Sequence, residues 1–219
     1  MAMEHSSGAQ ALALFDFDGT LIPGDSIVAF VGYARKKRAL SFGGYCAVLG
    51  QTARYLMGGM TDAEIKTRSL RFWVTLTPQQ QEELAQGFVR DCLLPQVYLD
   101  GKNELQRQKQ AGRLVVLVSA STDNYMRCVA DALGVDALLC TPIEADGAVR
   151  QNCKGEEKPR RVQDWLKEQG IEADWAGSYA FGDSKSDAPM LRLCGHPVLV
   201  NPKKALRQAL PEGDIVSWH

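Results

Sequence analysis

Two aspartates and a threonine near the N-terminus are the residues of this chain best suited to chemistry. Residues 11–21 begin as an apolar strand and end in Asp16, Asp18 and Thr20. Aspartate and glycine disfavour the interior of a strand, so the strand should end near Asp16. Alternate residues of an extended chain point the same way, so both carboxylates can reach one crevice. They repel each other unless a cation lies between them or one takes a proton. The run therefore predicts a hard metal ion, an acid/base group or both, with a solvated Asp-Gly turn as the alternative.

The rest of the chain alternates between helical and strand-like patterns. Thr61 and Thr77 each have the capping-box spacing of a helix start. The expected helices cover residues 25–33, 39–57, 61–72, 78–92, 97–111, 125–133, 158–169 and 188–193. The expected strands cover residues 11–16, 113–119, 137–141, 178–182 and 197–200, and a hairpin turn is expected within residues 143–150. This alternation predicts an α/β fold with a parallel sheet and right-handed crossovers.

The same pattern divides the chain into two parts. Residues 11–24 and 93–219 are predicted to form an α/β core, and residues 25–92 an inserted helical cap over the end of the first strand. Residues 1–10 are predicted to be a flexible tail.

Polar residues recur where the expected strands end. Ser119 lies at the end of the second expected strand, and Asp183 at the end of the fourth. Asp187 follows four residues after Asp183, and Lys158 lies near the start of a helix. In a parallel sheet these ends share one edge, so carboxylates, hydroxyls and an ammonium can face one cavity. Carboxylates and water satisfy Mg²⁺, and a lysine attracts an anionic substrate. A carboxylate can also act as nucleophile while a second transfers the proton. This inventory is typical of phosphoryl transfer.

These residues occur in the order of four motifs that define a known superfamily. The motifs are Asp16-Phe-Asp18-Gly-Thr20, Ser119, Lys158 and Gly182-Asp183-Ser-Lys-Ser-Asp187. On this basis the chain resembles the haloacid dehalogenase (HAD) superfamily over residues 11 to about 202. The helical insert resembles that of phosphoserine-phosphatase-like members, subfamily IB. The resemblance implies a Rossmann-like HAD core with an inserted C1-type cap.

The resemblance also implies a role for each motif residue. Asp16 would be the nucleophile that forms an aspartyl-phosphate, and Asp18 the general acid/base. The metal ligands would be the Asp16 carboxylate, the Asp18 backbone carbonyl and the Asp183 carboxylate, with Asp187 supporting them. Ser119 and Lys158 would bind the phosphoryl group, and Thr20 would order the loop beside it. An acid at position 18 favours a phosphatase or phosphomutase, since a halide leaving group needs no proton.

The cap is expected to read the part of the substrate beyond the phosphate. Asp25, at the entry to the cap, is a candidate for contacting a substrate amine. Arg68 and Arg71 are candidates for contacting a substrate carboxylate. For each of the three, a solvated helix charge is the alternative interpretation.

Composition excludes several other classes of protein. The chain has 219 residues and a formal net charge of −1, so nothing draws it generally towards nucleic acid. Its six scattered cysteines indicate reduced thiols in a cytoplasmic protein. No apolar stretch is long enough for a transmembrane helix. The basic run Arg35–Arg38 has two interpretations, a solvated helix end and a contact with anionic lipid.

Together these observations predict a Mg²⁺-dependent phosphomonoester hydrolase that acts on a small phosphorylated metabolite. Phosphoserine-like and histidinol-phosphate-like compounds are the candidate substrates. A phosphotransferase or phosphomutase is the alternative enzyme, and a phosphate-binding regulatory protein without turnover the alternative from another class. The sequence carries no information on oligomeric state.

Overall fold

A parallel sheet forms the centre of the molecule. The computed structural model describes residues 9–219, in which six strands pair in the order β3-β2-β1-β4-β5-β6, all parallel. The strands are β1 (Gln10–Phe15), β2 (Leu114–Thr122), β3 (Ala137–Thr141), β4 (Ala173–Gly182), β5 (His196–Val200) and β6 (Asp214–Val216). The predicted α/β fold with a parallel sheet is therefore confirmed, and the strand that directly precedes the two aspartates, β1, lies near the middle of the sheet.

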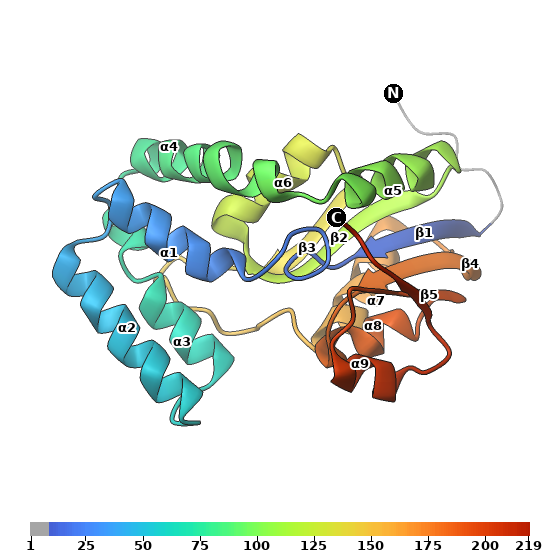
Figure 1. Ribbon diagram of the computed structural model, residues 1–219. Helices are drawn as coiled ribbons and strands as arrows, with labels where there is room; N and C mark the ends of the chain where they lie inside the picture. Colours follow the sequence, from blue (N-terminus) through green and yellow to red (C-terminus); the bar gives the residue numbers. More distant parts are fainter. Residues whose placement is uncertain (1–8) are drawn as a thin grey trace.

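Helices cover both faces of the sheet. In Figure 1, α5 and α6 lie on one side of it and α7, α8 and α9 on the other. Their bounds are α5 (Leu99–Gln110), α6 (Asp123–Leu133), α7 (Glu157–Gln169), α8 (Ala188–Leu191) and α9 (Lys204–Ala209). Alternate residues of β1 enter different cores: Ala13 and Phe15 pack on one side, Leu12 and Leu14 on the other. The continuous apolar run of this strand is thus explained by burial on both faces.

Four helices, which we call the cap, stand between β1 and α5 in the sequence. They are α1 (Ser26–Lys36), α2 (Phe42–Leu56), α3 (Asp62–Ser69) and α4 (Pro78–Phe88), and they extend beyond one end of the sheet in Figure 1. Thr61 and Thr77 form the predicted capping boxes, each accepting a hydrogen bond from the backbone N–H three residues on. The division at residues 24/25 and 92/93 stays a prediction.

Several predicted boundaries differ from the structure. The helix expected to reach residue 92 ends at Phe88 and continues as a π-helical turn, Val89–Leu93, just before Pro95, which cannot continue a helix. The segment expected to be a hairpin reverses at Asp146-Gly147 without forming strands, through a hydrogen bond from the Glu144 N–H to the Ala148 carbonyl. β6 and α9 were not predicted, because both are short and partly exposed.

The ends of the chain give two further outcomes. Of the predicted tail, residues 1–8 lie outside the described residues, and Gln10 belongs to β1 because its N–H donates to the Glu172 carbonyl. None of the helices within residues 9–219 is both long and apolar enough to cross a bilayer. All six cysteines fall in this part of the chain, and none of them is paired there.

An aromatic cluster joins the cap to the core. Phe30 of α1 is fully buried, and its ring centroid lies 5.0 Å from those of Phe88 and Tyr125 and 5.9 Å from that of Trp73. Tyr125 belongs to α6 of the core, so this contact fixes α1 over the end of the sheet. Aromatic pairs at such distances add to the stabilisation from burial alone.

We expect Phe30→Ala to lower the free energy of unfolding by about 3–5 kcal/mol, because it leaves a cavity between cap and core. Val28→Ala, on the same helix but 69% exposed, is the matched control and should change stability by less than about 0.5 kcal/mol. Urea denaturation of both variants measures the difference. Similar losses in the two variants would contradict the role of the cluster.

Candidate active site

Asp16, Asp187 and Lys158 form a buried ionic cluster at the carboxyl end of the sheet. The Lys158 Nζ atom donates to Asp16 Oδ1 at 2.6 Å and to Asp187 Oδ1 at 2.7 Å, and all three side chains are buried. Asp16 directly follows β1, Lys158 lies in the first turn of α7, and Asp187 precedes α8. The sequence predicted that these strand and helix ends would meet at one edge of the sheet, and in the structure they do.

The charges in this cluster alter one another. Burial and the nearby Asp187 charge raise the pKa of Asp16, whereas the ammonium of Lys158 opposes the rise and favours the ionised carboxylate. Burial alone would also raise the pKa of Asp187, but the ammonium of Lys158 holds it below its ordinary value. Burial would lower the pKa of Lys158, yet the two carboxylates raise it above its ordinary range. Lys158 is therefore a permanent cation beside Asp16.

Asp183 completes a group of three carboxylates suited to a metal ion. One oxygen from each of Asp16, Asp183 and Asp187 lies within 4.8 Å of the other two, and all three residues are buried. Burial raises the pKa of Asp183, and Lys203, which donates to its Oδ2, opposes this. A buried set of carboxylate oxygens fits a hard divalent cation. The Asp18 side chain lies outside this set, as expected for a residue predicted to bind the metal through its backbone carbonyl, and that ligand stays a prediction.

Gly19 keeps space open beside Asp183. Its backbone φ of +84° is one that residues with a side chain rarely adopt. A Cβ atom built on Gly19 would lie 2.5 Å from Asp183 Oδ2. Only glycine fits this turn without moving the carboxylate.

Asp18 faces the cap and has a hydrogen-bond network of its own. Its Oδ1 accepts from the Ser26 N–H at 2.8 Å, and its Oδ2 accepts from the hydroxyls of Ser26, at 3.1 Å, and Ser121. The Ser26 hydroxyl also lies 2.8 Å from that of Tyr125. Burial raises the pKa of Asp18 to about 6, while the hydrogen bonds from Ser121 and Ser26 oppose the rise. A carboxyl group with this pKa can both give and take a proton near neutral pH.

Thr20 and Ser119 are fully buried beside these groups. The Thr20 hydroxyl donates to Asp16 Oδ2 at 3.3 Å, and the Ser119 hydroxyl accepts from the Ser121 N–H at 3.0 Å. Both side chains lie behind the residues that line the cavity, where Ala120 and Ser121 take part instead. Their predicted contacts with a phosphoryl group stay predictions.

A cavity of about 800 Å³ lies between these residues and the cap. Asp16, Asp18, Lys158 and Asp183 lie on the core side of its lining. The cap side is largely apolar and carries four polar groups of interest. The polar residues are Asp25, Tyr55, Asp62 and Lys66. The aliphatic residues of the cap lining include Ile27, Val28, Val31, Val48 and Leu49.

Of the predicted specificity residues, only Asp25 reaches this cavity. Its side chain accepts hydrogen bonds from the N–H groups of Ile27 and Val28, so Asp25 is also the N-cap of α1. Arg68 and Arg71 are exposed and lie outside the lining residues. Arg68 lies two residues after Lys66 and so on the opposite side of α3, and Arg71 lies in the turn that follows the helix.

Lys66 is the cap residue that the sequence did not single out. Its ammonium donates to the Ala120 carbonyl at 2.6 Å and to Asn152 Oδ1 at 2.7 Å, which links α3 to the end of β2. Burial lowers its pKa to about 8. Lys203, the partner of Asp183, follows β5 and could have been found by the rule that polar residues collect after strands. A lysine within a helix gives no such signal.

Comparisons with known proteins agree with this geometry. The family model of haloacid dehalogenase-like hydrolases matches residues 13–192. The chain belongs to this family. It is 30% identical over 213 residues to the histidinol-phosphatase of Neisseria meningitidis, covering 92% of this chain and 95% of the relative. It is 29% identical over 217 residues to the phosphoserine phosphatase of Albidiferax ferrireducens, covering 90% and 81% of the two chains.

Solved structures support the same assignment of fold. A protein of unknown function from Bordetella pertussis superposes on the present chain with a TM-score of 0.86 and 26% sequence identity. The match covers 95% of the present chain and 99% of that one. A phosphoserine phosphatase, solved as a phospho-aspartyl intermediate analogue, has a TM-score of 0.63 and 20% identity, with 95% and 93% covered. The predicted membership of the HAD superfamily is confirmed.

We expect Gly19→Ala to weaken Mg²⁺ binding by about 10–100-fold, because the new methyl group displaces the Asp183 carboxylate. Gly24→Ala is the matched control: Gly24 has the same φ of +84° but no atom within 4 Å of a built Cβ. Both variants should lose about 1–2 kcal/mol of stability from the backbone strain. Calorimetric titration with Mg²⁺ separates them, and equal affinities would contradict the crowding at Asp183.

Proposed function

We propose that this HAD-family phosphatase hydrolyses the phosphomonoester of a small metabolite through a phosphorylated Asp16. One observation carries the proposal: two carboxyl groups of one strand end, Asp16 and Asp18, border the same cavity with different partners. Asp16 is ion-paired to Lys158, whereas Asp18 accepts hydrogen bonds from uncharged hydroxyl and amide groups. A nucleophile and a proton donor need these two different environments.

The reaction divides into two steps. A carboxylate oxygen of Asp16 attacks phosphorus, and a P–O bond to the enzyme forms as the bond to the substrate oxygen breaks. Asp18 gives its proton to the departing oxygen, which leaves as an alcohol. Asp18, now ionised, takes a proton from water, and the resulting oxygen attacks the same phosphorus to release inorganic phosphate and free Asp16.

Lys158 and the remaining acids serve the charges of this reaction. The fixed ammonium of Lys158 would attract the phosphoryl oxygens and offset the charge of Asp16. Asp16, Asp183 and the backbone carbonyl of Asp18 would hold Mg²⁺, supported by Asp187. When bound, the ion supplies positive charge opposite the phosphoryl oxygens. Ser119 and Thr20 would complete the phosphate site from behind.

The cap lining supports a substrate that bears an amine. Asp25 and Asp62 present carboxylates to the cavity, and aliphatic side chains form much of its wall. Asp62 is held by Lys154 and by the Tyr55 hydroxyl at 2.6 Å, which leaves Asp25 as the more exposed acid. The names of the relatives, histidinol-phosphatase and phosphoserine phosphatase, belong to enzymes for amine-bearing phosphomonoesters. We infer a substrate of this class.

Phosphate release from a panel of phosphomonoesters, with Mg²⁺ and with chelator, tests the proposal. We expect Mg²⁺-dependent release, with amine-bearing compounds such as histidinol phosphate and phosphoserine preferred over sugar phosphates. Asp25→Asn should reduce that preference by about 10-fold while sparing phosphates without an amine. Phosphate passing to an added alcohol in preference to water would favour a phosphotransferase instead. No release from any compound would contradict the hydrolase.

We expect Asp16→Asn to reduce turnover by about 10⁴-fold or more, because an amide cannot form the phosphoryl-enzyme. After acid quenching during turnover, mass spectrometry should find one added phosphoryl group on the peptide containing Asp16 in the unaltered enzyme only. The thermal transition of the variant serves as the control for folding. Near-normal turnover of Asp16→Asn would exclude the covalent mechanism.

We expect the effect of Asp18→Asn to depend on the leaving group. An alkyl phosphate needs a proton on the departing oxygen, so its phosphoryl-enzyme should form about 10²–10⁴-fold more slowly. A nitrophenyl phosphate releases a stable phenolate, so its first step should slow far less. Single-turnover kinetics with the two substrates measures the contrast, and equal slowing of both would remove Asp18 from the acid role.

A further inference from the structure

The cap has an outer surface that the proposed reaction does not use. Between Asp25 and Asp62 the sequence contains five lysines and arginines and no acidic residue, although the whole chain is balanced at 25 basic to 26 acidic residues. Four of these cations form the run Arg35–Arg38 at the end of α1, and the fifth is Arg54 in the last turn of α2. Residues 26–61 therefore carry a formal charge of +5 in a chain whose net charge is −1.

The helix α2 has an apolar face without a partner. Of its 15 residues, all within the described part of the chain, only Val48 is buried. Phe42, Leu49 and Leu56 follow one another at intervals of seven and are 68%, 52% and 78% exposed; Leu49 also borders the active-site cavity, whereas Phe42 and Leu56 do not. Met57, which directly follows Leu56, is 80% exposed. Residues seven apart lie on the same side of a helix, so these side chains form one stripe. Figure 1 shows α2 at the edge of the molecule farthest from the sheet.

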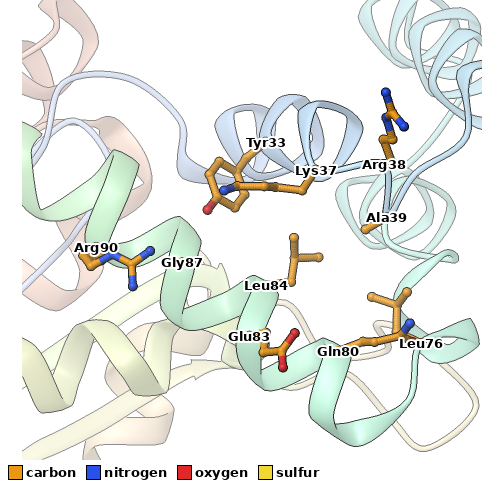
Figure 2. A pocket seen from close by; sticks show the side chains of 10 residues that line it. All are labelled: Tyr33, Lys37, Arg38, Ala39, Leu76, Gln80, Glu83, Leu84, Gly87 and Arg90. Atoms are coloured by element: carbon orange, nitrogen blue, oxygen red, sulfur yellow. The ribbon is translucent and has the colours of Figure 1, made fainter.

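The cations lie beside this stripe. The guanidinium of Arg35 lies 5.6 Å from the ring centroid of Phe42, which joins the basic run to the first residue of the stripe. Figure 2 shows the groove between α1 and α4, and Arg38 points out of it, away from the other lining side chains. Lys37 instead lies across Tyr33 in this groove, 3.8 Å from Asp91. Lys36, Arg38 and Arg54 are exposed too, and unlike Lys37 they form no ion pair within residues 9–219.

We propose that this cap face, made of Phe42, Leu56 and Met57 with Lys36, Arg38 and Arg54, docks the protein on a bilayer containing anionic phospholipid. Exposed aliphatic and aromatic side chains enter the boundary between head groups and acyl chains, and flanking cations are drawn to the lipid phosphates. The absence of any carboxylate from residues 26–61 leaves nothing on this segment to repel the lipid surface.

A second copy of the chain is a poorer occupant. A two-fold interface places the same patch on both partners, so the three exposed cations of one copy would face those of the other. Such like-charge contacts are unfavourable unless anions lie between them. An anionic bilayer satisfies both the charge and the apolar stripe.

Sedimentation with vesicles of phosphatidylcholine, with and without phosphatidylglycerol, tests the proposal on the full chain. We expect binding to the vesicles that contain phosphatidylglycerol, and loss of that binding as ionic strength rises. The triple variant Lys36→Gln/Arg38→Asn/Arg54→Gln should bind about fivefold more weakly for each cation removed, on the order of 100-fold in total. Leu56→Gln/Met57→Gln should also release the protein from the vesicles.

Matched changes on the core are the controls. Lys102→Gln/Lys167→Gln removes exposed cations, and Leu99→Gln/Ile215→Gln removes apolar residues that are 67% and 56% exposed. Binding of both control variants should equal that of the unaltered protein, and circular dichroism should show all variants folded. Three results would overturn the proposal: equal binding to uncharged vesicles, equal loss in the controls, or a dimer in solution that Leu56→Gln/Met57→Gln abolishes.

Discussion

The buried contact of Lys158 with Asp16 and Asp187 is the interaction on which the rest of the site depends. Its two short hydrogen bonds join α7, the end of β1 and the turn before α8. Removing one partner of such a buried group leaves an uncompensated charge, which costs several kcal/mol. The cluster therefore holds three segments at one edge of the sheet while it keeps a cation beside the carboxylate of Asp16.

Asp18 shows how two acids of one strand end acquire different properties. Asp16 points into the ionic cluster of the core, whereas Asp18 is held by Ser26 of α1 and Ser121 of β2. The first residue of the cap thus supplies two of the hydrogen bonds that hold Asp18. Because Phe30 anchors the same helix against Tyr125, the position of the cap and the environment of Asp18 are set together.

Much of the fold could be predicted because the governing signals are local. The apolar run before Asp16 and the capping boxes at Thr61 and Thr77 fix a strand and two helix starts within a few residues. The errors fall where local signals are weak. β6 has three residues and is stabilised by pairing with β5, and the turn at Gly147 packs against Val74 of the cap, contacts that no short window of sequence contains.

For the site, the sequence is enough to single out the charged groups that the structure brings together. Residue type and position after strands or at helix starts mark Asp16, Asp18, Lys158, Asp183 and Asp187. Parallel strands end at one edge, so that rule brings them together without knowledge of packing. Which cap residues face these groups is visible only in the folded chain. Lys66 reaches Ala120 and Asn152, whereas Arg68 and Arg71 turn to solvent. Which side of a cap helix faces the core depends on contacts between segments more than 50 residues apart, as between Lys66 and Ala120, and a local pattern does not encode them.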